Sequence, residues 1–361
     1  MDGMIASADS GWMESLAPGR FAPETVYLNT AATGLLPTGA AAAMGEAIGV
    51  LAAGAPGNVD FSATVDAART AYARLVGVPA ARVAAGGSVA VYCGLVAQSL
   101  PAGAEVLVAE GDFASLVNPF HTRPGLRVRT VPLERLAEEV RPDTALVAVS
   151  AVQSADGRIA ALGAISAAAR AYGARTLVDV SQAAGWFPLD AAAHDFTVGV
   201  GYKWLMGPRG VAFLTVPEDL GALTPVFAGW VTGEDPWLTC YGKVEPLAST
   251  ARRFDENVAV LSYVGALHGL ALVEELGVER IGAHDRALAD RFRAGVVALG
   301  LTPVPAEGSA IVAVPGVRGA AERPAAAGVQ VSARAGRLRA AFHLYNSTAD
   351  VDRLLEVLAR R

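Results

Sequence analysis

The sequence is poor in lysine. Of its 29 Lys and Arg residues, only Lys203 and Lys243 are lysine. Arginine stays protonated and does not form imines with aldehydes, so any imine chemistry must use one of these two residues. Lys243 lies among polar and turn residues in CYGKVEP and is expected to be a solvated lysine. Lys203 follows an apolar stretch, where the structural alternative is a lysine with a buried stem and a solvated amine.

Several classes of protein are excluded by what else is missing. Two cysteines, Cys93 and Cys240, make neither a disulfide framework nor a zinc site, and we expect free, buried thiols in a reducing compartment. The net charge is -6 and Lys and Arg form no cluster, so nucleic acid is not an expected partner. No apolar run reaches the roughly 18 residues that cross a membrane, and residues 1–16 are not typical of a secretory signal. The prediction is a cytoplasmic protein with a small-molecule partner, no membrane contact and no metal site.

Strand and helix signals alternate through the first two thirds of the chain. Apolar runs predict strands at residues 104–110, 126–132, 144–152 and 174–181, with a helical crossover at 161–172. Strands that alternate with helices imply a mostly parallel sheet covered on both faces. Two further strands, at 195–202 and 210–217, are predicted to form a hairpin-like return behind Lys203.

The character of the chain changes after about residue 257. Two helices are predicted over 258–277 and 279–299, followed by short strands, a loose loop at 315–327, a strand over 337–346 and a last helix over 349–361. We therefore expect an α/β fold with a large domain over 27–274 and a smaller α+β domain over 275–361. Residues 1–26 are expected to pack on the smaller domain.

Polar residues fall at the carboxyl ends of two predicted strands, where parallel sheets bind ligands. Gly87 and Ser88 follow a short strand and open a helix, so free backbone N–H groups and the helix dipole make either an anion cradle or an ordinary turn. Asp179 ends another strand and is either the partner of a pyridinium nitrogen or a helix N-cap. On this interpretation, Lys203 forms the imine and moves the proton at the substrate's alpha carbon. Together these groups indicate a pyridoxal phosphate (PLP) site.

Candidate substrate contacts lie at the two ends of the chain. Arg339 precedes His343 by four residues on a predicted strand, so the two share a face, and a buried arginine needs an anion such as a substrate carboxylate. His343 is expected to be structural. Small residues in 26–37 allow a close backbone approach, and Asn29 and Ala32 are the candidate contacts there. Three large aromatic residues are expected in the core or at an interface: Trp230, Trp237 and Phe254.

The stretches VDVSQAAGWFPLD and GYKWLMGPRGVAFL resemble the class V aminotransferase family of fold type I PLP enzymes. That family includes cysteine desulfurases, kynureninase and isopenicillin N epimerase-like proteins. The resemblance implies a PLP-dependent transferase fold of type I, with a mostly parallel sheet of the seven-stranded type and a smaller α+β domain. It also implies a homodimer. By motif, Asp179 pairs with the pyridine nitrogen, Gln182 contacts the ring hydroxyl, Lys203 carries the cofactor and Arg339 binds the substrate carboxylate.

The resemblance supplies the remaining cofactor contacts and also shows departures. Gly87, Ser88 and Val89 match the phosphate turn, Phe113 matches the ring-stacking residue, and Tyr202 stands where desulfurases have histidine. Val89 lacks the last hydroxyl of the phosphate turn, and Val200 replaces a serine that helps to hold phosphate, so other donors are needed, for example from a second subunit. The family's reactive cysteine loop is absent between residues 334 and 339, which argues against persulfide formation.

The expected function is that of a PLP-dependent enzyme acting on an amino acid through an external aldimine, with transamination favoured. A beta-eliminating carbon–sulfur lyase, an epimerase and a non-catalytic PLP-binding protein stay open as alternatives. The sequence leaves the side chain of the substrate open.

Overall fold

A seven-stranded sheet organises the larger part of the molecule. The computed structural model describes residues 13–58 and 60–360. The strand order is β2-β8-β7-β6-β5-β3-β4, and β8 runs antiparallel to both of its neighbours while the other pairs are parallel. The prediction of a mostly parallel sheet is therefore confirmed. The strands are β2 (Val83–Gly86), β3 (Glu105–Ala109), β4 (Arg127–Val131), β5 (Thr144–Ser150), β6 (Arg175–Asp179), β7 (Phe196–Val200) and β8 (Ala212–Thr215).

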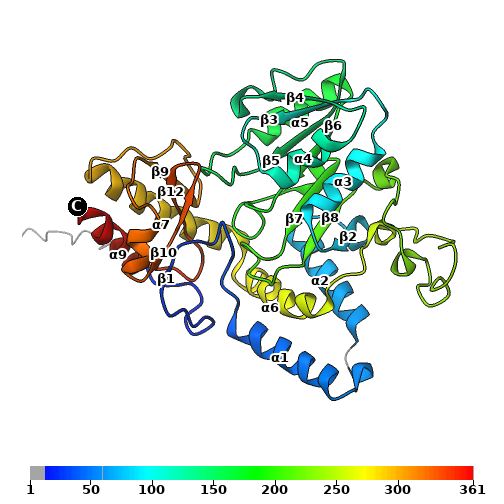
Figure 1. The fold of residues 1–361 in the computed structure, drawn as a ribbon, viewed down its shortest axis with the longest axis horizontal. Helices are drawn as coiled ribbons and strands as arrows, with labels where there is room; N and C mark the ends of the chain where they lie inside the picture. The colour runs from blue at the N-terminus through cyan, green and yellow to red at the C-terminus, as the bar shows by residue number, and fades with distance from the viewer. Residues whose placement is uncertain (1–12, 59, 361) are drawn as a thin grey trace, which may run out of the picture.

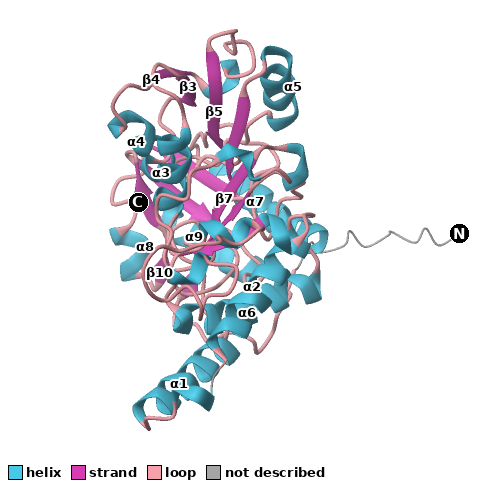
Figure 2. Cartoon of the chain, turned by 90° about the vertical axis from the view of Figure 1, so that its right-hand side faces the viewer, coloured by secondary structure: helices cyan, strands magenta, loops and turns pink. Residues whose placement is uncertain are grey.

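Helices cover both faces of this sheet (Figure 1). Successive residues of a strand point to opposite faces, and Leu177 and Val178 of β6 accordingly enter different core clusters. One cluster packs against α3 and α4, and the other packs against α2 and α6. Figure 2 shows α1 extending away from this body. The helices are α1 (Thr38–Ala52), α2 (Phe61–Leu75), α3 (Val89–Ser99), α4 (Ala114–Thr122), α5 (Leu162–Tyr172) and α6 (Val260–Leu276).

A second, smaller group of elements, made of β1 and the elements after α6, lies to the left in Figure 1. It contains an antiparallel sheet in the order β11-β12-β9 and a parallel pair of β1 with β10. Its core joins Phe292, Leu338 and Leu354 to Leu28 near the start of the described chain. The elements are β1 (Val26–Tyr27), α7 (Val278–Ala298), β9 (Ile311–Pro315), α8 (Glu322–Ala326), β10 (Val329–Gln330), β11 (Ser332–Arg334), β12 (Arg337–Ala341) and α9 (Thr348–Ala359).

The first described residues pack on the end of the chain. The backbone N–H of Leu16 donates to the carbonyl of Leu344 at 2.8 Å, and that of Met13 donates to the Thr348 hydroxyl at 2.7 Å. The division into two domains, with residues 1–26 assigned to the smaller one, stays a prediction. Residues 1–12 lie outside the described residues.

Some sequence predictions are wrong in detail. The predicted loop at 315–327 contains the short helix α8, and the predicted strand ends at Ala341, so His343 lies in the turn after it. For Trp237 only the core alternative is wrong, because it is 76% exposed and packs on Trp230 at 5.5 Å between ring centroids; a position at an interface stays a prediction. Of the two cysteines, Cys93 is buried but Cys240 is partly exposed. Lys243 is exposed and pairs with Glu245, as expected of a solvated lysine.

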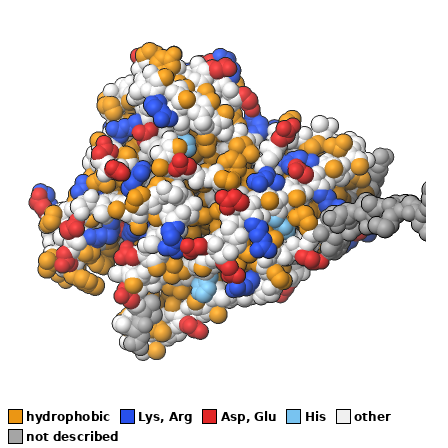
Figure 3. All heavy atoms as spheres, turned by 180° about the vertical axis from the view of Figure 1, so that it is seen from behind, with side chains coloured by type: hydrophobic (Ala, Val, Ile, Leu, Met, Phe, Trp, Pro, Cys, Tyr) orange, Lys and Arg blue, Asp and Glu red, His pale blue; other side chains and the backbone are white. Residues whose placement is uncertain are grey.

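Charges of both signs are mixed on the surface. Figure 3 shows basic and acidic side chains interspersed over one face of the molecule. Within the described residues, no single helix is long and apolar enough to cross a membrane. Helices α6 and α7 reach the length and apolar composition of a membrane span only when they are taken together, and an 88° bend separates them.

Candidate active site

A cavity of about 190 Å³ lies at the carboxyl ends of the central strands. It brings together residues that follow β2, β6 and β7, three strands that run in the same direction. All of the predicted cofactor contacts except Gln182 line it. The lining residues are Gly87, Ser88, Val89, Phe113, Ser115, Asp179, Ser181, Val200, Tyr202, Lys203, Arg209 and Gly210.

Lys203 is almost wholly buried, with 4% of its surface exposed. Its Nζ lies 5.0 Å from the centre of the Phe113 ring and 5.8 Å from that of Tyr202. Burial lowers the pKa of Lys203 to about 8; the Asp179 carboxylate opposes this shift, and Arg339 and Arg209 add to it. A buried amine with a lowered pKa is the form in which lysine attacks a carbonyl carbon.

Asp179 is the last residue of β6 and is also buried. Its Oδ1 accepts a hydrogen bond from the backbone N–H of Ser181 at 2.8 Å, so the carboxylate caps the turn that follows the strand. Burial raises the pKa of Asp179, while Lys203 and the Ser181 contact oppose this shift. Asp179 therefore caps a turn rather than a helix and also lines the cavity, and its pairing with a ring nitrogen stays a prediction.

The turn between β2 and α3 faces the cavity with its backbone. Ser88 is the N-cap of α3 and accepts from the Ala90 N–H at 3.2 Å. A Cβ on Gly86 would lie 2.6 Å from both the Tyr92 hydroxyl and Glu256 Oε1, so only glycine fits there. The carboxylate of Glu256 accepts a hydrogen bond from the Gly87 backbone. The N-terminus of α3 can still bind an anion, although the Glu256 carboxylate lies beside it.

Gln182 lies behind the cavity and connects three segments. Its Nε2 donates to the carbonyl of Ala31 at 2.9 Å and to Ser154 Oγ at 3.1 Å. Its Oε1 accepts from the Trp204 indole at 2.8 Å. The amide orientation is thus fixed by one acceptor contact and two donor contacts.

Arg339 reaches the same serine from β12. One guanidinium nitrogen, Nη1, donates to the Ser154 carbonyl at 2.5 Å and to its hydroxyl at 3.1 Å. Nε is buried and has no partner among the described residues. Arg339 is 2% exposed, and burial lowers its pKa to about 10, with Arg334 adding to the shift. Such a guanidinium has spare donors for an anion. His343 does not share this environment, since it contacts Asp285 and the Trp204 carbonyl.

None of the three predicted substrate contacts is among the residues that line the cavity: neither Arg339 nor the loop residues Asn29 and Ala32. Asn29 is engaged elsewhere, because its Oδ1 accepts from the Ser332 hydroxyl at 2.5 Å. Their loop still packs on the lysine loop, since the Gly34 N–H donates to the Tyr202 carbonyl at 2.9 Å. A Cβ on Gly34 would lie 2.0 Å from the Lys203 carbonyl oxygen, so this approach requires glycine.

Sequence reasoning missed three polar residues of the cavity. Arg209 lies over the Tyr202 ring at 4.4 Å and donates to Thr33 Oγ1 at 3.3 Å. Ser115 comes from α4, and Ser181 accepts from the Val200 N–H at 3.2 Å. Arg209 could have been predicted from the GPRG segment that follows Lys203. A cation this close in sequence to the imine-forming lysine lies where it can bind an anion.

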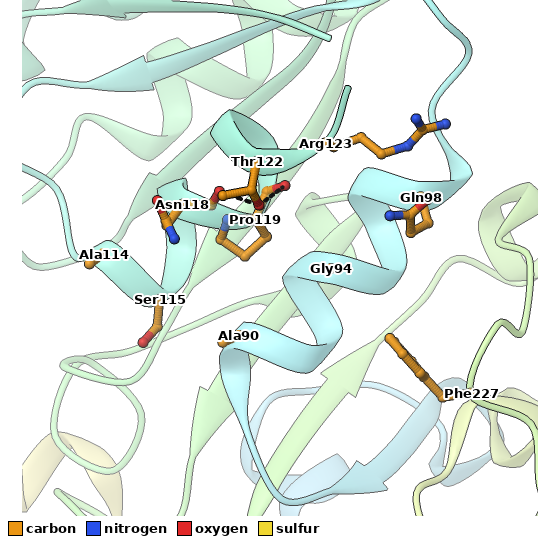
Figure 4. A pocket seen from close by; sticks show the side chains of 10 residues that line it. All are labelled: Ala90, Gly94, Gln98, Ala114, Ser115, Asn118, Pro119, Thr122, Arg123 and Phe227. Carbon is orange, nitrogen blue, oxygen red and sulfur yellow. Dashed lines mark hydrogen bonds between the residues drawn. The ribbon is translucent and has the colours of Figure 1, made fainter. Parts of the chain in front are cut away.

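A second cavity of about 430 Å³ adjoins the first at Ser115, between α3 and α4 (Figure 4). Figure 4 shows Ala90, Gly94 and Gln98 along α3, and Phe227 on a separate loop. Small side chains leave this groove open. In the described parts of the chain, no group of three or more His, Cys, Asp or Glu side chains is placed to hold a metal.

The residues present fit one cofactor. A buried amine beneath an aromatic ring suits an aldehyde on a planar ring, a buried acid suits a ring nitrogen, and a helix N-terminus suits a phosphate. With the mostly parallel sheet, these groups define the class of fold type I PLP-dependent enzymes. The family model "Aminotransferase class-V" matches residues 26–354, and the chain belongs to this family of PLP-dependent enzymes.

Characterised relatives and solved structures agree with this assignment. The chain is 32% identical to a kynureninase of Deinococcus radiodurans over 49% of its length and 46% of the relative's. It is also 32% identical to an isopenicillin N epimerase of Streptomyces clavuligerus, over 63% of its length and 62% of the relative's. The aligned regions thus span less than two thirds of these relatives. A cysteine desulfurase structure from Thermococcus onnurineus covers 93% of the chain, with 94% of its own length matched, at 21% identity and a TM-score of 0.80, which shows the shared fold.

Proposed function

We propose that the protein binds an amino acid through Arg339 and moves the proton at its alpha carbon with Lys203. The observation that carries this proposal is the position of Lys203, buried between Phe113 and the Asp179 side of one cavity. A lysine in that position loses much of its solvation, so its amine takes part in chemistry near neutral pH.

Each residue has one task. Bound PLP supplies an electron sink for the substrate's alpha carbon. Asp179 would keep a proton on the ring nitrogen, Gln182 would contact the ring hydroxyl, and Phe113 would cover the ring. Gly87, Ser88 and Val89 would form the phosphate turn, with backbone donors at Ser88 and Val89, and Arg209 and Ser115 would offer side-chain donors in place of the hydroxyls missing at Val89 and Val200. Lys203 would remove and return the proton, because its amine lines the cavity and its lowered pKa makes it a base near neutral pH.

Transamination is the reaction that we propose, since the family model is that of aminotransferases. Epimerisation is a second candidate, favoured by the 32% identity to an isopenicillin N epimerase, and beta elimination by a carbon–sulfur lyase is a third. Persulfide formation is not proposed. Strands β11 and β12 are joined by only Ala335 and Gly336, both with positive φ, so no loop for a reactive cysteine lies there.

We propose a homodimer with two domains per chain, over 27–274 and 275–361 with 1–26. The cavity of about 190 Å³ is smaller than the roughly 300 Å³ typical of ligand sites, which supports a wall from a second copy. An apolar surface segment supports the same proposal, because large exposed apolar patches mark interfaces. Its residues are Val226, Phe227, Trp237, Leu238 and Tyr241.

The test starts from cofactor attachment. Protein incubated with PLP and reduced with borohydride should carry the cofactor on Lys203 and not on Lys243, as peptide mass spectrometry would show. Lys203→Ala should lose this label and Lys243→Ala should keep it. A protein that takes up no PLP refutes the proposal. Amino acids added to the loaded enzyme then separate the reactions: pyridoxamine phosphate marks a transaminase, pyruvate with ammonia a lyase, and loss of optical activity alone an epimerase.

A further inference from the structure

A buried Asp–His pair connects the smaller group of elements to the loop that carries Lys203. Nδ1 of His343 lies 2.9 Å from Asp285 Oδ2, and Nε2 lies 3.0 Å from the carbonyl oxygen of Trp204. Both side chains of the pair are 0% exposed. Asp285 belongs to α7 and His343 follows β12, so the contact joins three segments that are far apart in the sequence.

We propose that Asp285 and His343 are positioning residues, a proton-sharing pair that holds the Trp204 carbonyl and thereby fixes Lys203 in the cavity. The inference rests on the proposed function, because it concerns the lysine to which that function assigns the chemistry. Neither member of the pair lines the cavity.

The backbone around Lys203 shows why this contact matters. The Tyr202 carbonyl accepts from the Gly34 N–H at 2.9 Å, and the Lys203 carbonyl accepts from the Met206 N–H at 3.0 Å. The next carbonyl, that of Trp204, is held by the His343 side chain. The indole of the same tryptophan donates to Gln182, so the contact also steadies a proposed cofactor ligand. A shift of about 1 Å in such a reacting group can cost roughly 100-fold in rate.

Hydrogen-bond chemistry fixes the protonation of the pair. A carbonyl only accepts, so Nε2 of His343 must carry a hydrogen. The bond between Nδ1 and Asp285 needs a second hydrogen, held either by the carboxyl or by the imidazole. Both arrangements are neutral overall and both keep the Trp204 contact. Removing that proton breaks one of the two bonds and leaves a net negative charge in the interior, which is costly.

The surroundings of the pair disfavour an isolated charge. Burial raises the pKa of Asp285 to about 6, opposed by the His343 ring and, more weakly, by Arg286. The neighbouring His284 contacts the Asn346 carbonyl at 3.0 Å, and burial lowers its pKa to about 4, so it is neutral at pH 7. The rings of Trp204 and Tyr345 pack edge-on against His343 at 5.1 and 5.4 Å.

Two variants separate a positioning role from simple packing. Asp285→Asn keeps both hydrogen bonds, because its amide donates to Nδ1 and leaves the hydrogen on Nε2. The double variant Asp285→Leu with His343→Phe removes both bonds yet leaves no lone buried charge, and such apolar replacements of buried pairs often preserve stability. Should the double variant not fold, the smaller pair Asp285→Val with His343→Leu makes the same test.

The chain's two lysines make the measurement direct. In protein labelled with ¹⁵N-lysine and free of cofactor, Nζ signals arise from Lys203 and Lys243 alone. We expect Lys203 to titrate near 8 in the unaltered protein and in Asp285→Asn. In the double variant the loosened loop admits water to the amine, and its midpoint should rise by about one pH unit. Lys243 should titrate identically in all three proteins.

Kinetics of the loaded enzyme complete the test. The double variant should lose about tenfold or more in kcat with KM changed less than about threefold, while Asp285→Asn stays within about threefold in both. A folded double variant whose Lys203 midpoint and kcat match those of the unaltered protein overturns the inference. Because the lysine titration uses no cofactor, a failure to bind PLP refutes the proposed function without deciding this one.

Discussion

The guanidinium of Arg69 and the carboxylate of Asp255 form a buried ion pair, with Nη2 2.6 Å from Oδ2. Asp255 Oδ1 also accepts from the backbone N–H of Ala85 at 2.8 Å, two residues before Gly87. Arg69 Nη1 donates to the Val83 carbonyl of the same strand at 2.7 Å. The pair thus ties α2 to the strand that precedes the proposed phosphate turn, so the position of this turn depends on contacts made 170 residues along the chain.

Removing one partner of this pair should destabilise the fold strongly. Asp255→Ala leaves Arg69 charged and buried, and we expect a loss of about 3–5 kcal/mol in the free energy of unfolding. Asp66→Ala is the matched control, because Asp66 contacts the same arginine from an exposed position and should cost less than about 1 kcal/mol. Denaturant unfolding measures both values. Equal losses in the two variants would show that the buried Arg69–Asp255 contact contributes no more to the free energy of unfolding than the exposed Arg69–Asp66 contact.

Cofactor attachment should depend on pH through Lys203. Only the unprotonated amine attacks, and burial lowers the pKa of this amine to about 8. The rate of PLP uptake should therefore rise about tenfold per pH unit below 8 and level off above it. Stopped-flow absorbance of cofactor-free protein mixed with PLP measures this profile. A rate that keeps rising to pH 10, as for a solvated lysine, would contradict the position described for Lys203.

The local parts of the site could be predicted from sequence. Asp179 ends an apolar strand, and Lys203 stands out because lysine is so scarce, so both follow from neighbours along the chain. The pairing of His343 with Asp285 could not be predicted, because 58 residues separate them and only the packing of α7 against the turn after β12 brings them together. Helix α4 was missed for a different reason, since Pro119 lies inside it and proline argues against a helix interior.

Two charges near the phosphate turn should act on cofactor affinity in opposite directions. Arg209 lines the cavity, while the carboxylate of Glu256 contacts the Gly87 backbone. Arg209→Gln removes attraction for a phosphate and should weaken PLP binding about tenfold, and Glu256→Gln removes repulsion and should tighten it by about threefold or more. Equilibrium titration of cofactor-free protein, followed by absorbance, gives both dissociation constants. Shifts in the same direction would show that the phosphate does not lie between these two groups.

Arg339 should govern substrate binding without affecting the cofactor. Its guanidinium is buried, Nε has no partner, and Ser154 holds only Nη1, so donors remain for a carboxylate. Hydrogen bonds to charged groups contribute about 1.5–3 kcal/mol, so Arg339→Gln should raise KM for an amino acid by roughly 10- to 100-fold. The dissociation constant for PLP should change less than about threefold. Arg337→Gln, two residues earlier on β12 and paired with Asp156, is the matched control and should leave KM unchanged. A larger effect on PLP affinity than on KM would place Arg339 with the cofactor rather than with the substrate.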